Sequence, residues 1–157
     1  MGEIVRVFIY DELMNDLVFK EHGLEYKSKT SVTLSAYKRV FNKVPVDNCG
    51  IEELGLTNVE PTDDNLGMMI GVLHEMDEKF LTKLDEIYQH PQEYIRKVMN
   101  FQRHDFVSTK GFIYIAPLEK TKAGLRPSKS MMKKFRGAKK TMDMLHFSRL
   151  MNTPTCD

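Results

Sequence analysis

Apolar side chains recur at helical spacing near the middle of the chain. Phe80, Leu81, Leu84, Ile87 and Tyr88 stand at positions i, i+1, i+4, i+7 and i+8, which places them on one face of a helix. The pattern predicts a helix that ends at Tyr88, with this side chain as its last inward-facing position. The residue type at such a position decides what chemistry an adjoining cavity supports, because a carboxylate acts as a general base and a tyrosine serves poorly as one.

The rest of the pattern predicts a series of strands followed by helices. Runs of β-branched and aromatic residues, or alternation of apolar and polar positions, predict strands at residues 4–10, within 30–41, and at 56–59, 67–76, 94–101 and 106–115. Helical spacing and capping residues predict a short helix before His22-Gly23, a helix from Asp77 to Tyr88, one over 129–136 capped by Ser128, and a last one over 142–151. This order indicates the α+β class, with a curved or barrel-like sheet, flanking helices and a single domain over residues 1–157.

Composition narrows the class of protein without identifying it. The 157 residues are 41% hydrophobic and 29% charged, as is ordinary for a globular protein. No apolar run approaches the roughly 20 residues of a membrane span, and the N-terminus lacks a secretory pattern, so we expect a cytoplasmic protein with no membrane partner. Cys49 and Cys156 form no CxxC pair and the five histidines lack metal-ligand spacing. We therefore expect no disulfide framework and no metal site.

Charge is spread unevenly although the net charge is only +1. Residues 47–88 are rich in acids and residues 119–140 are rich in bases. Lys129, Lys133, Arg136 and Lys140 fall at helical spacing, so one positive stripe that faces phosphates is an alternative interpretation. A solvated helix face is favoured over nucleic-acid binding, because no known nucleic-acid motif and no interleaved aromatic residues accompany the bases.

Two segments of the first two thirds of the chain carry a family resemblance. Residues 7–14, Val-Phe-Ile-Tyr-Asp-Glu-Leu-Met, resemble a strand that ends in Tyr-Gly-Ser-Asn-Leu or Tyr-Gly-Thr-Leu. Residues 67–73, followed by Leu-Asp-Glu-Ile-Tyr at 84–88, resemble a Gly-x-hydrophobic strand that leads to Leu-Asp-x-x-Glu-Gly. A tyrosine and a basic residue follow a little downstream, here Tyr94 and Arg96.

The C-terminal third adds Pro127-Ser128 and then Gly137-Ala138-Lys139. In this order and spacing the segments resemble the gamma-glutamylcyclotransferase family over roughly residues 5–150. The resemblance implies a small mixed barrel whose cavity opens near the loop after the first strand. It also implies that backbone N–H groups of this loop hold the glutamyl carboxylate of the substrate. The family glutamate then acts as acid and base while the substrate α-amine attacks its own γ-carbonyl, which yields 5-oxoproline without a cofactor.

The chain departs from the family pattern at both key places. Asp11 replaces the loop glycine and Glu12 follows it, so side chains and negative charge crowd a turn that should approach an anion. Tyr88 stands at the position of the catalytic glutamate and Gln89 at that of the following glycine. A hydroxyl with a pKa near 10 is a poor base for an ammonium group at neutral pH.

Two hypotheses about function follow. The first is a divergent protein that has lost cyclotransfer and binds a small ligand, or another protein, in the remaining cavity. The second is an active cyclotransferase on a gamma-glutamyl amine or peptide, in which Glu93, Glu12 or Asp85 replaces the missing base. In the second hypothesis the candidate catalytic residues are Glu93 and Glu12. Both hypotheses place the candidate binding residues at Tyr10, Asp11, Glu12, Leu13, Tyr88 and Tyr94. The sequence leaves the oligomeric state open.

Overall fold

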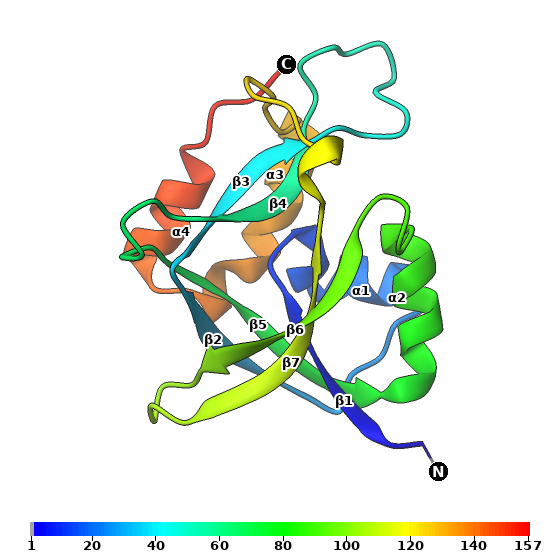
Figure 1. Ribbon diagram of the computed structural model, residues 1–157, viewed down its shortest axis with the longest axis vertical. Coiled ribbons are helices and arrows are strands. Elements are labelled where there is room, and N and C mark those ends of the chain that lie inside the picture. Colours follow the sequence, from blue (N-terminus) through cyan, green and yellow to red (C-terminus); the bar gives the residue numbers. More distant parts are fainter. Residues whose placement is uncertain (1) are drawn as a thin grey trace.

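A computed structural model describes residues 2–157, and five strands close into a barrel (Figure 1). The strands follow one another around the barrel in the order β1 (Ile4–Ile9), β5 (Met68–Asp77), β2 (Ser28–Ser35), β6 (Ile95–Gln102) and β7 (Ser108–Ile115). Neighbours are antiparallel except for β7 and β1, which run parallel where Val7 lies opposite Phe112. The barrel is therefore mixed, and the predicted α+β class is confirmed.

The second half of β1, residues 7–9, is buried on both faces, which explains why these positions are all apolar, whereas Arg6 in the first half is exposed. Val7 and Ile9 belong to a core cluster that also contains side chains of the helices, among them Leu84 of α2. Phe8 belongs to a second cluster, which consists almost wholly of strand residues and includes Phe101, whose ring stacks on that of Phe8 at 4.5 Å. A strand between two apolar layers shows no alternation, in contrast to a strand that has one face in water.

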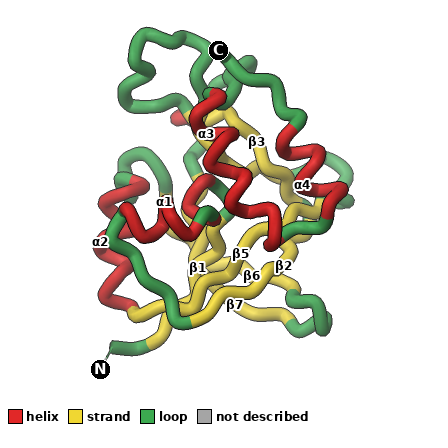
Figure 2. Tube along the Cα trace, turned by 180° about the vertical axis from the view of Figure 1, so that it is seen from behind, coloured by secondary structure: helices red, strands yellow, loops and turns green. Residues whose placement is uncertain are grey.

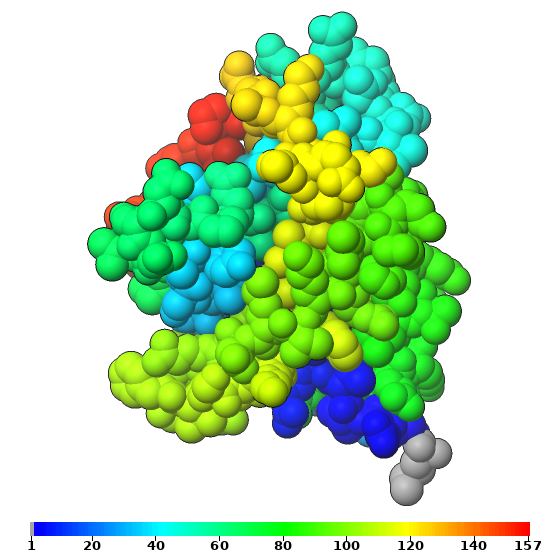
Figure 3. Space-filling view, in the orientation of Figure 1, coloured from blue at the N-terminus to red at the C-terminus, as the bar shows by residue number. Residues whose placement is uncertain are grey.

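A second sheet lies beside the barrel and consists of β3 (Tyr37–Lys43) and β4 (Leu56–Pro61). These strands pair antiparallel, with an irregularity between Val40 and Lys43. The loop between them, residues 44–55, lies against residues 118–124 at the surface (Figure 3). The amide of Val44 donates to the carbonyl oxygen of Lys120 at 2.8 Å, which joins the two segments.

Within residues 2–157, four short α-helices pack against the strands. They are α1 (Asp16–Glu21), α2 (Leu81–Tyr88), α3 (Lys129–Phe135) and α4 (Met144–Met151). Viewed from behind, α1 and α2 lie to one side of α3 and α4 lies to the other (Figure 2). None of the helices within residues 2–157 combines the length and the apolar character that crossing a membrane requires.

Most predicted elements are present, with corrections at their ends. Asp77 does cap, but it caps a 3-10 turn over Glu78–Phe80, and α2 begins only at Leu81. The helix capped by Ser128 ends at Phe135, and a 3-10 segment over Arg136–Thr141 follows. The proposed basic stripe is therefore not the face of one helix. The last helix begins at Met144, behind the cap Asp143, two residues later than predicted.

Candidate functional site

The loop after β1 folds back on its own side chains. Asp11 caps a 3-10 turn over Glu12–Met14, and its Oδ1 accepts the amide of Leu13 at 3.0 Å. Its carbonyl oxygen accepts the amide of Met14, also at 3.0 Å. The Asp11 side chain, only 7% exposed, thus occupies an amide of the loop that the resemblance assigned to the substrate carboxylate.

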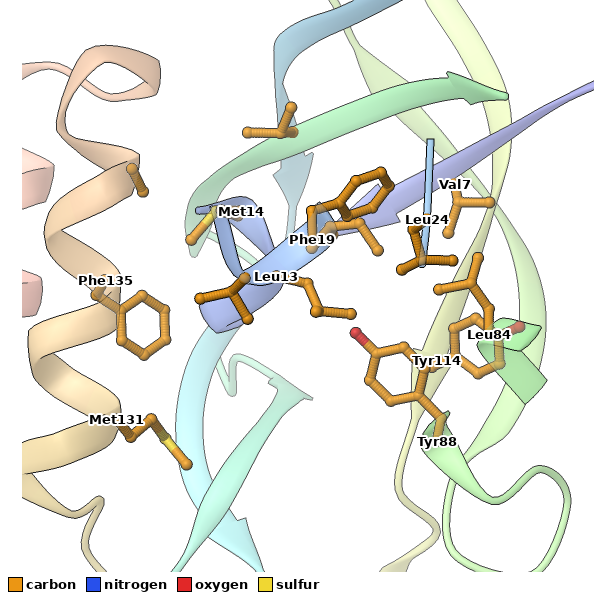
Figure 4. Close-up of a cluster of buried hydrophobic side chains, with 14 of the residues drawn as sticks. Val7, Leu13, Met14, Phe19, Leu24, Leu84, Tyr88, Tyr114, Met131 and Phe135 are labelled. Atoms are coloured by element: carbon orange, nitrogen blue, oxygen red, sulfur yellow. The ribbon is translucent and has the colours of Figure 1, made fainter. Parts of the chain in front are cut away.

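Tyr88 ends α2 and faces this loop. Its hydroxyl donates to Oδ2 of Asp11 at 2.7 Å, across 77 residues of sequence. Its ring stacks on Tyr114 at 4.4 Å and meets Tyr94 edge-on at 5.3 Å. Figure 4 shows the Tyr88 side chain directed from α2 toward the region of Leu13, with Tyr114 beside it. The predicted inward position of Tyr88 is therefore confirmed, and the Asp11 carboxylate is its polar partner.

The α2 helix ends in a residue with a left-handed backbone, Gln89, which explains why the family pattern has a glycine at this position. Gln89 has φ 52° and ψ 50° and its amide donates to the Asp85 and Glu86 carbonyl oxygens. Glycine is the favoured residue at such a C-cap because it has no Cβ to clash. Gln89 keeps this backbone conformation without the glycine.

A small cavity of about 100 Å³ adjoins the Asp11–Tyr88 pair. Its walls are Asp11, Glu12, Leu13, His22, Leu56, Thr57, Ile87, Tyr88, Tyr94 and Met131. The Tyr94 hydroxyl donates to the Thr57 carbonyl oxygen at 2.8 Å and so fixes one wall. Five of the six predicted binding residues line this cavity. Tyr10, the sixth, is buried beside it in the core and donates its hydroxyl to the Tyr114 carbonyl oxygen.

Burial sets the electrostatics of the site. It raises the pKa of the Asp11 carboxyl above its usual range, against the lowering effect of the Tyr88 hydrogen bond. Burial and the neighbouring Asp11 charge together raise the pKa of Glu12 to about 7. Burial also raises the pKa of the Tyr88 hydroxyl well above its usual range, and the Asp11 charge adds to this shift. Tyr88 therefore remains neutral and acts as a hydrogen-bond donor.

Glu93 lies outside the cavity and is neutralised by two lysines. Its Oε1 is 2.9 Å from Nζ of Lys43, whose side chain is 1% exposed, and its Oε2 is 3.2 Å from Nζ of Lys120. The hydrogen bond from Lys43 and then that from Lys120 lower the pKa of Glu93. These contacts join the loop after α2 to β3 and to the segment after β7.

Asp85 is engaged in a different cluster. It accepts from Nη1 of Arg96 at 2.9 Å and from the Tyr114 hydroxyl at 2.6 Å. Its side chain thereby fastens α2 to β6 and β7, and it does not line the cavity.

Several cavity residues went unnoticed in the sequence. Leu56, Thr57 and Met131 come from β4 and α3, and His22 follows α1. Nothing in their local pattern distinguishes them, because only the packing of these elements against the loop after β1 brings them together. Among the side chains of residues 2–157 there is no group of three His, Cys, Asp or Glu suited to holding a metal ion.

The barrel, the flanking helices and the loop beside Tyr88 define the gamma-glutamyl cyclotransferase-like fold. A solved structure described as gamma-glutamyl cyclotransferase superposes with a TM-score of 0.81 at 16% identity, over 98% of this chain and 89% of that one. An uncharacterized human protein matches with the same TM-score and coverage at 15% identity. A yeast gamma-glutamyl cyclotransferase specific to glutathione matches with a TM-score of 0.67 at 11% identity, over 96% and 95% of the two chains. No protein-family model and no curated sequence matches this chain.

Proposed function

We propose that this chain is a divergent gamma-glutamyl cyclotransferase-like protein that binds a small ligand in the cavity beside Asp11 and does not perform cyclotransfer. The observation that carries the proposal is the Asp11 carboxylate, which accepts both the Leu13 amide and the Tyr88 hydroxyl. A substrate carboxylate would have to displace this buried anion from the loop. Like charges at one site repel strongly where water is scarce.

The position of the family acid-base residue supports the same proposal. Cyclotransfer requires a group that takes a proton from the attacking ammonium and returns it to the leaving amine. The Tyr88 hydroxyl, with its raised pKa, is the wrong kind of group for the first step. It is also already committed as a donor to Asp11.

A second candidate function rests on Glu12. Its carboxyl lines the cavity, and its pKa of about 7 is close to the optimum for a general base at neutral pH. In this case Glu12 would accept the proton of the substrate α-ammonium. The amine would then attack the γ-carbonyl to form the lactam C–N bond, and the bond to the leaving amine would break. The leaving nitrogen would take up two protons, one returned by Glu12 and one released by the attacking nitrogen. Glu93 suits this role less, because Lys43 and Lys120 hold it as a carboxylate outside the cavity.

Release of 5-oxoproline separates the two functions. The protein is incubated with gamma-glutamyl amino acids and gamma-glutamyl amines, and we expect no product above the uncatalysed background. Turnover that disappears in Glu12→Gln and persists in Glu93→Gln would establish the enzyme and reject our proposal. Both variants change a carboxylate into an isosteric amide. Because Glu93→Gln also removes the ion-pair partner of the buried Lys43, circular dichroism must show that both variants are folded before their turnover is compared.

The reverse experiment restores the family residues. Asp11→Gly together with Tyr88→Glu removes the internal anion and supplies a carboxylate at the end of α2. We expect 5-oxoproline to appear in this double variant only, because each change removes one of the two obstacles. Circular dichroism and urea unfolding establish that the double variant is folded before its activity is scored.

A further inference from the structure

Each hydroxyl group around the cavity already donates a hydrogen bond to another group of the protein. The Tyr88 hydroxyl donates to Asp11, and the Tyr94 hydroxyl donates to the Thr57 carbonyl oxygen. The Thr57 hydroxyl is 3.5 Å from the sulfur of Met131, which accepts it. A hydroxyl that has donated its proton presents only lone pairs to a further partner. These three side chains therefore offer acceptors to the cavity.

The remaining polar walls are also acceptors. Nδ1 of His22 is 2.8 Å from the Val18 carbonyl oxygen, so it carries the proton and leaves Nε2 as a lone pair in the neutral ring. The carboxylate of Glu12 lines the cavity, its own backbone amide is a hydrogen-bond partner, and no lysine or arginine within residues 2–157 forms an ion pair with it. A half-buried carboxylate without a cationic partner is costly, because it has lost part of its hydration and no positive charge compensates the loss.

The nearby positive groups do not reach into the cavity. Arg39 donates Nε to the Tyr10 carbonyl oxygen at 2.8 Å and Nη2 to the Ile70 carbonyl oxygen at 2.7 Å. Lys134 on α3 is exposed, and its charge is the smallest of the effects on the pKa of Glu12. Neither residue is part of the cavity wall. The cavity thus combines acceptors, aromatic rings and negative charge, and the side chains that line it offer no free hydrogen-bond donor in these protonation states.

We propose that the ligand of this cavity is a primary alkylammonium ion, whose charged group pairs with Glu12 and whose chain lies against the apolar wall. This inference rests on the proposed function and names its ligand class. An ammonium group supplies three donors and a charge, which match the acceptors and the carboxylate of the cavity wall. Leu13, Leu56 and Ile87 offer the chain an apolar surface, and about 100 Å³ suits an ion of a few carbon atoms.

The test compares three ligands with chains of equal length. n-Butylammonium, 1-butanol and butyrate are titrated into the folded protein near pH 8, and amide and tyrosine-ring NMR signals are followed. We expect n-butylammonium to shift the Glu12 and Leu13 amides, with an affinity about tenfold higher than that of butanol, since a hydrogen bond to a charged group contributes about that factor. Butyrate should bind more weakly than either. The absence of saturable shifts with n-butylammonium at tens of millimolar would overturn the proposal.

A matched pair of variants places the cation. Glu12→Gln should weaken n-butylammonium about tenfold and leave butanol unchanged. Glu86→Gln, which removes an exposed carboxylate on the far side of α2, should change neither. Retention of the wild-type NMR dispersion shows that each variant is folded. Equal weakening by the two variants would mean that the protein's overall charge attracts the ion, and would reject the Glu12 contact.

Proton linkage gives an independent readout. Only ionised Glu12 pairs with the ammonium, and its pKa is about 7, so affinity should rise about tenfold between about pH 6 and about pH 8. Asp11, His22, Tyr88 and Tyr94 are the other titratable groups on the cavity wall, and Lys134 approaches from α3. Because several charged or titratable groups surround Glu12, the rise must disappear in Glu12→Gln to be attributed to Glu12. A rise that persists in that variant would contradict the assignment.

Failure of this inference and failure of the proposed function give different results. If butanol or butyrate binds in the cavity and n-butylammonium does not, the ligand class is wrong while the binding function stands. If 5-oxoproline is formed with Glu12 as the base, the proposed function itself is wrong.

Discussion

His74 is a buried histidine whose replacement should change how stability depends on pH. It lies on β5 with no exposed surface, and its ring stacks on Phe19 at 4.7 Å. Nδ1 lies 3.3 Å from the Val72 carbonyl oxygen, and Nε2 has no hydrogen-bond partner within residues 2–157. Burial lowers the pKa of His74 to about 4. The native state therefore holds this ring neutral, and His74→Leu removes both the orphaned nitrogen and the titration.

The sign and the size of the pH effect on stability follow from the pKa values of His74 in the unfolded and the folded chain. The unfolded chain takes up a proton at His74 below about pH 6.5, whereas the folded chain does so only near pH 4. The contribution of His74 to the free energy of unfolding is thus fully present above about pH 6.5 and is lost as the pH falls toward about 4. At 1.36 kcal/mol per pKa unit the loss between about pH 7.5 and about pH 4.5 is about 2.5 kcal/mol.

Glu12 opposes this trend in the wild type. Its pKa is raised to about 7, so the folded state binds a proton that the unfolded state releases, and stability from Glu12 falls as the pH rises through 7. The two residues partly cancel in the wild-type profile. The informative quantity is therefore the difference between His74→Leu and the wild type at each pH, in which the Glu12 contribution drops out.

Urea unfolding followed by circular dichroism at several values between about pH 7.5 and about pH 4.5 measures this difference. Near pH 7.5 we expect the variant to lie within about 1 kcal/mol of the wild type, because it loses a ring contact and also an unsatisfied polar atom. Near pH 4.5 it should have gained about 2.5 kcal/mol relative to the wild type. His104→Gln, at an exposed turn between β6 and β7, should show no such gain. A constant difference at every pH would refute the argument that His74 is held neutral by burial.

Two further substitutions, each with a control variant, test the C-cap of α2 at Gln89 and the ion pair of Glu93 in the loop that follows. Gln89→Gly should raise the free energy of unfolding by about 1 kcal/mol, since Gln89 has a left-handed backbone, while Gln92→Gly, at an exposed loop position without positive φ, should give no gain. Glu93→Gln should lower it by about 3–5 kcal/mol, because Lys43 would remain charged and buried without its carboxylate, while Lys120→Gln should cost less than about 1 kcal/mol. Chemical denaturation measures both pairs, and equal effects within a pair would contradict the reasoning.

The strands and helices could largely be predicted because their patterns are local. The inward face of α2 and the buried second half of β1 follow from the apolar pattern alone. The ends of elements were harder to predict. Asp77 caps a 3-10 turn as readily as an α-helix, since both leave free amides at their start. The helix after Ser128 stops at Phe135 although the basic spacing continues beyond it, because charge spacing does not determine where packing ends a helix.

The candidate site was predictable in its residue types and not in its pairings. The sequence identified Asp11 and Tyr88 as departures from a family pattern, but their hydrogen bond joins residues 77 positions apart. The distinction between the two candidate bases also depends on the fold. Glu12 remains unpaired at the cavity, whereas Glu93 is neutralised by a buried lysine from β3 and by Lys120. No local signal marks which of two surface-type acids will meet a lysine in three dimensions.

The Asp11–Tyr88 hydrogen bond makes the two departures physically dependent on each other. A carboxylate at position 11 is buried and needs donors, and the Leu13 amide and the Tyr88 hydroxyl supply them. A glutamate at position 88 would instead bring a second carboxylate to within hydrogen-bond distance of the first, so one of the two would have to hold a proton. The family base and the Asp11 anion therefore exclude each other at neutral pH. A change at position 11 that fills the loop with its own anion accordingly favours a neutral donor at position 88, and it leaves Glu12 as the unpaired charge at the cavity.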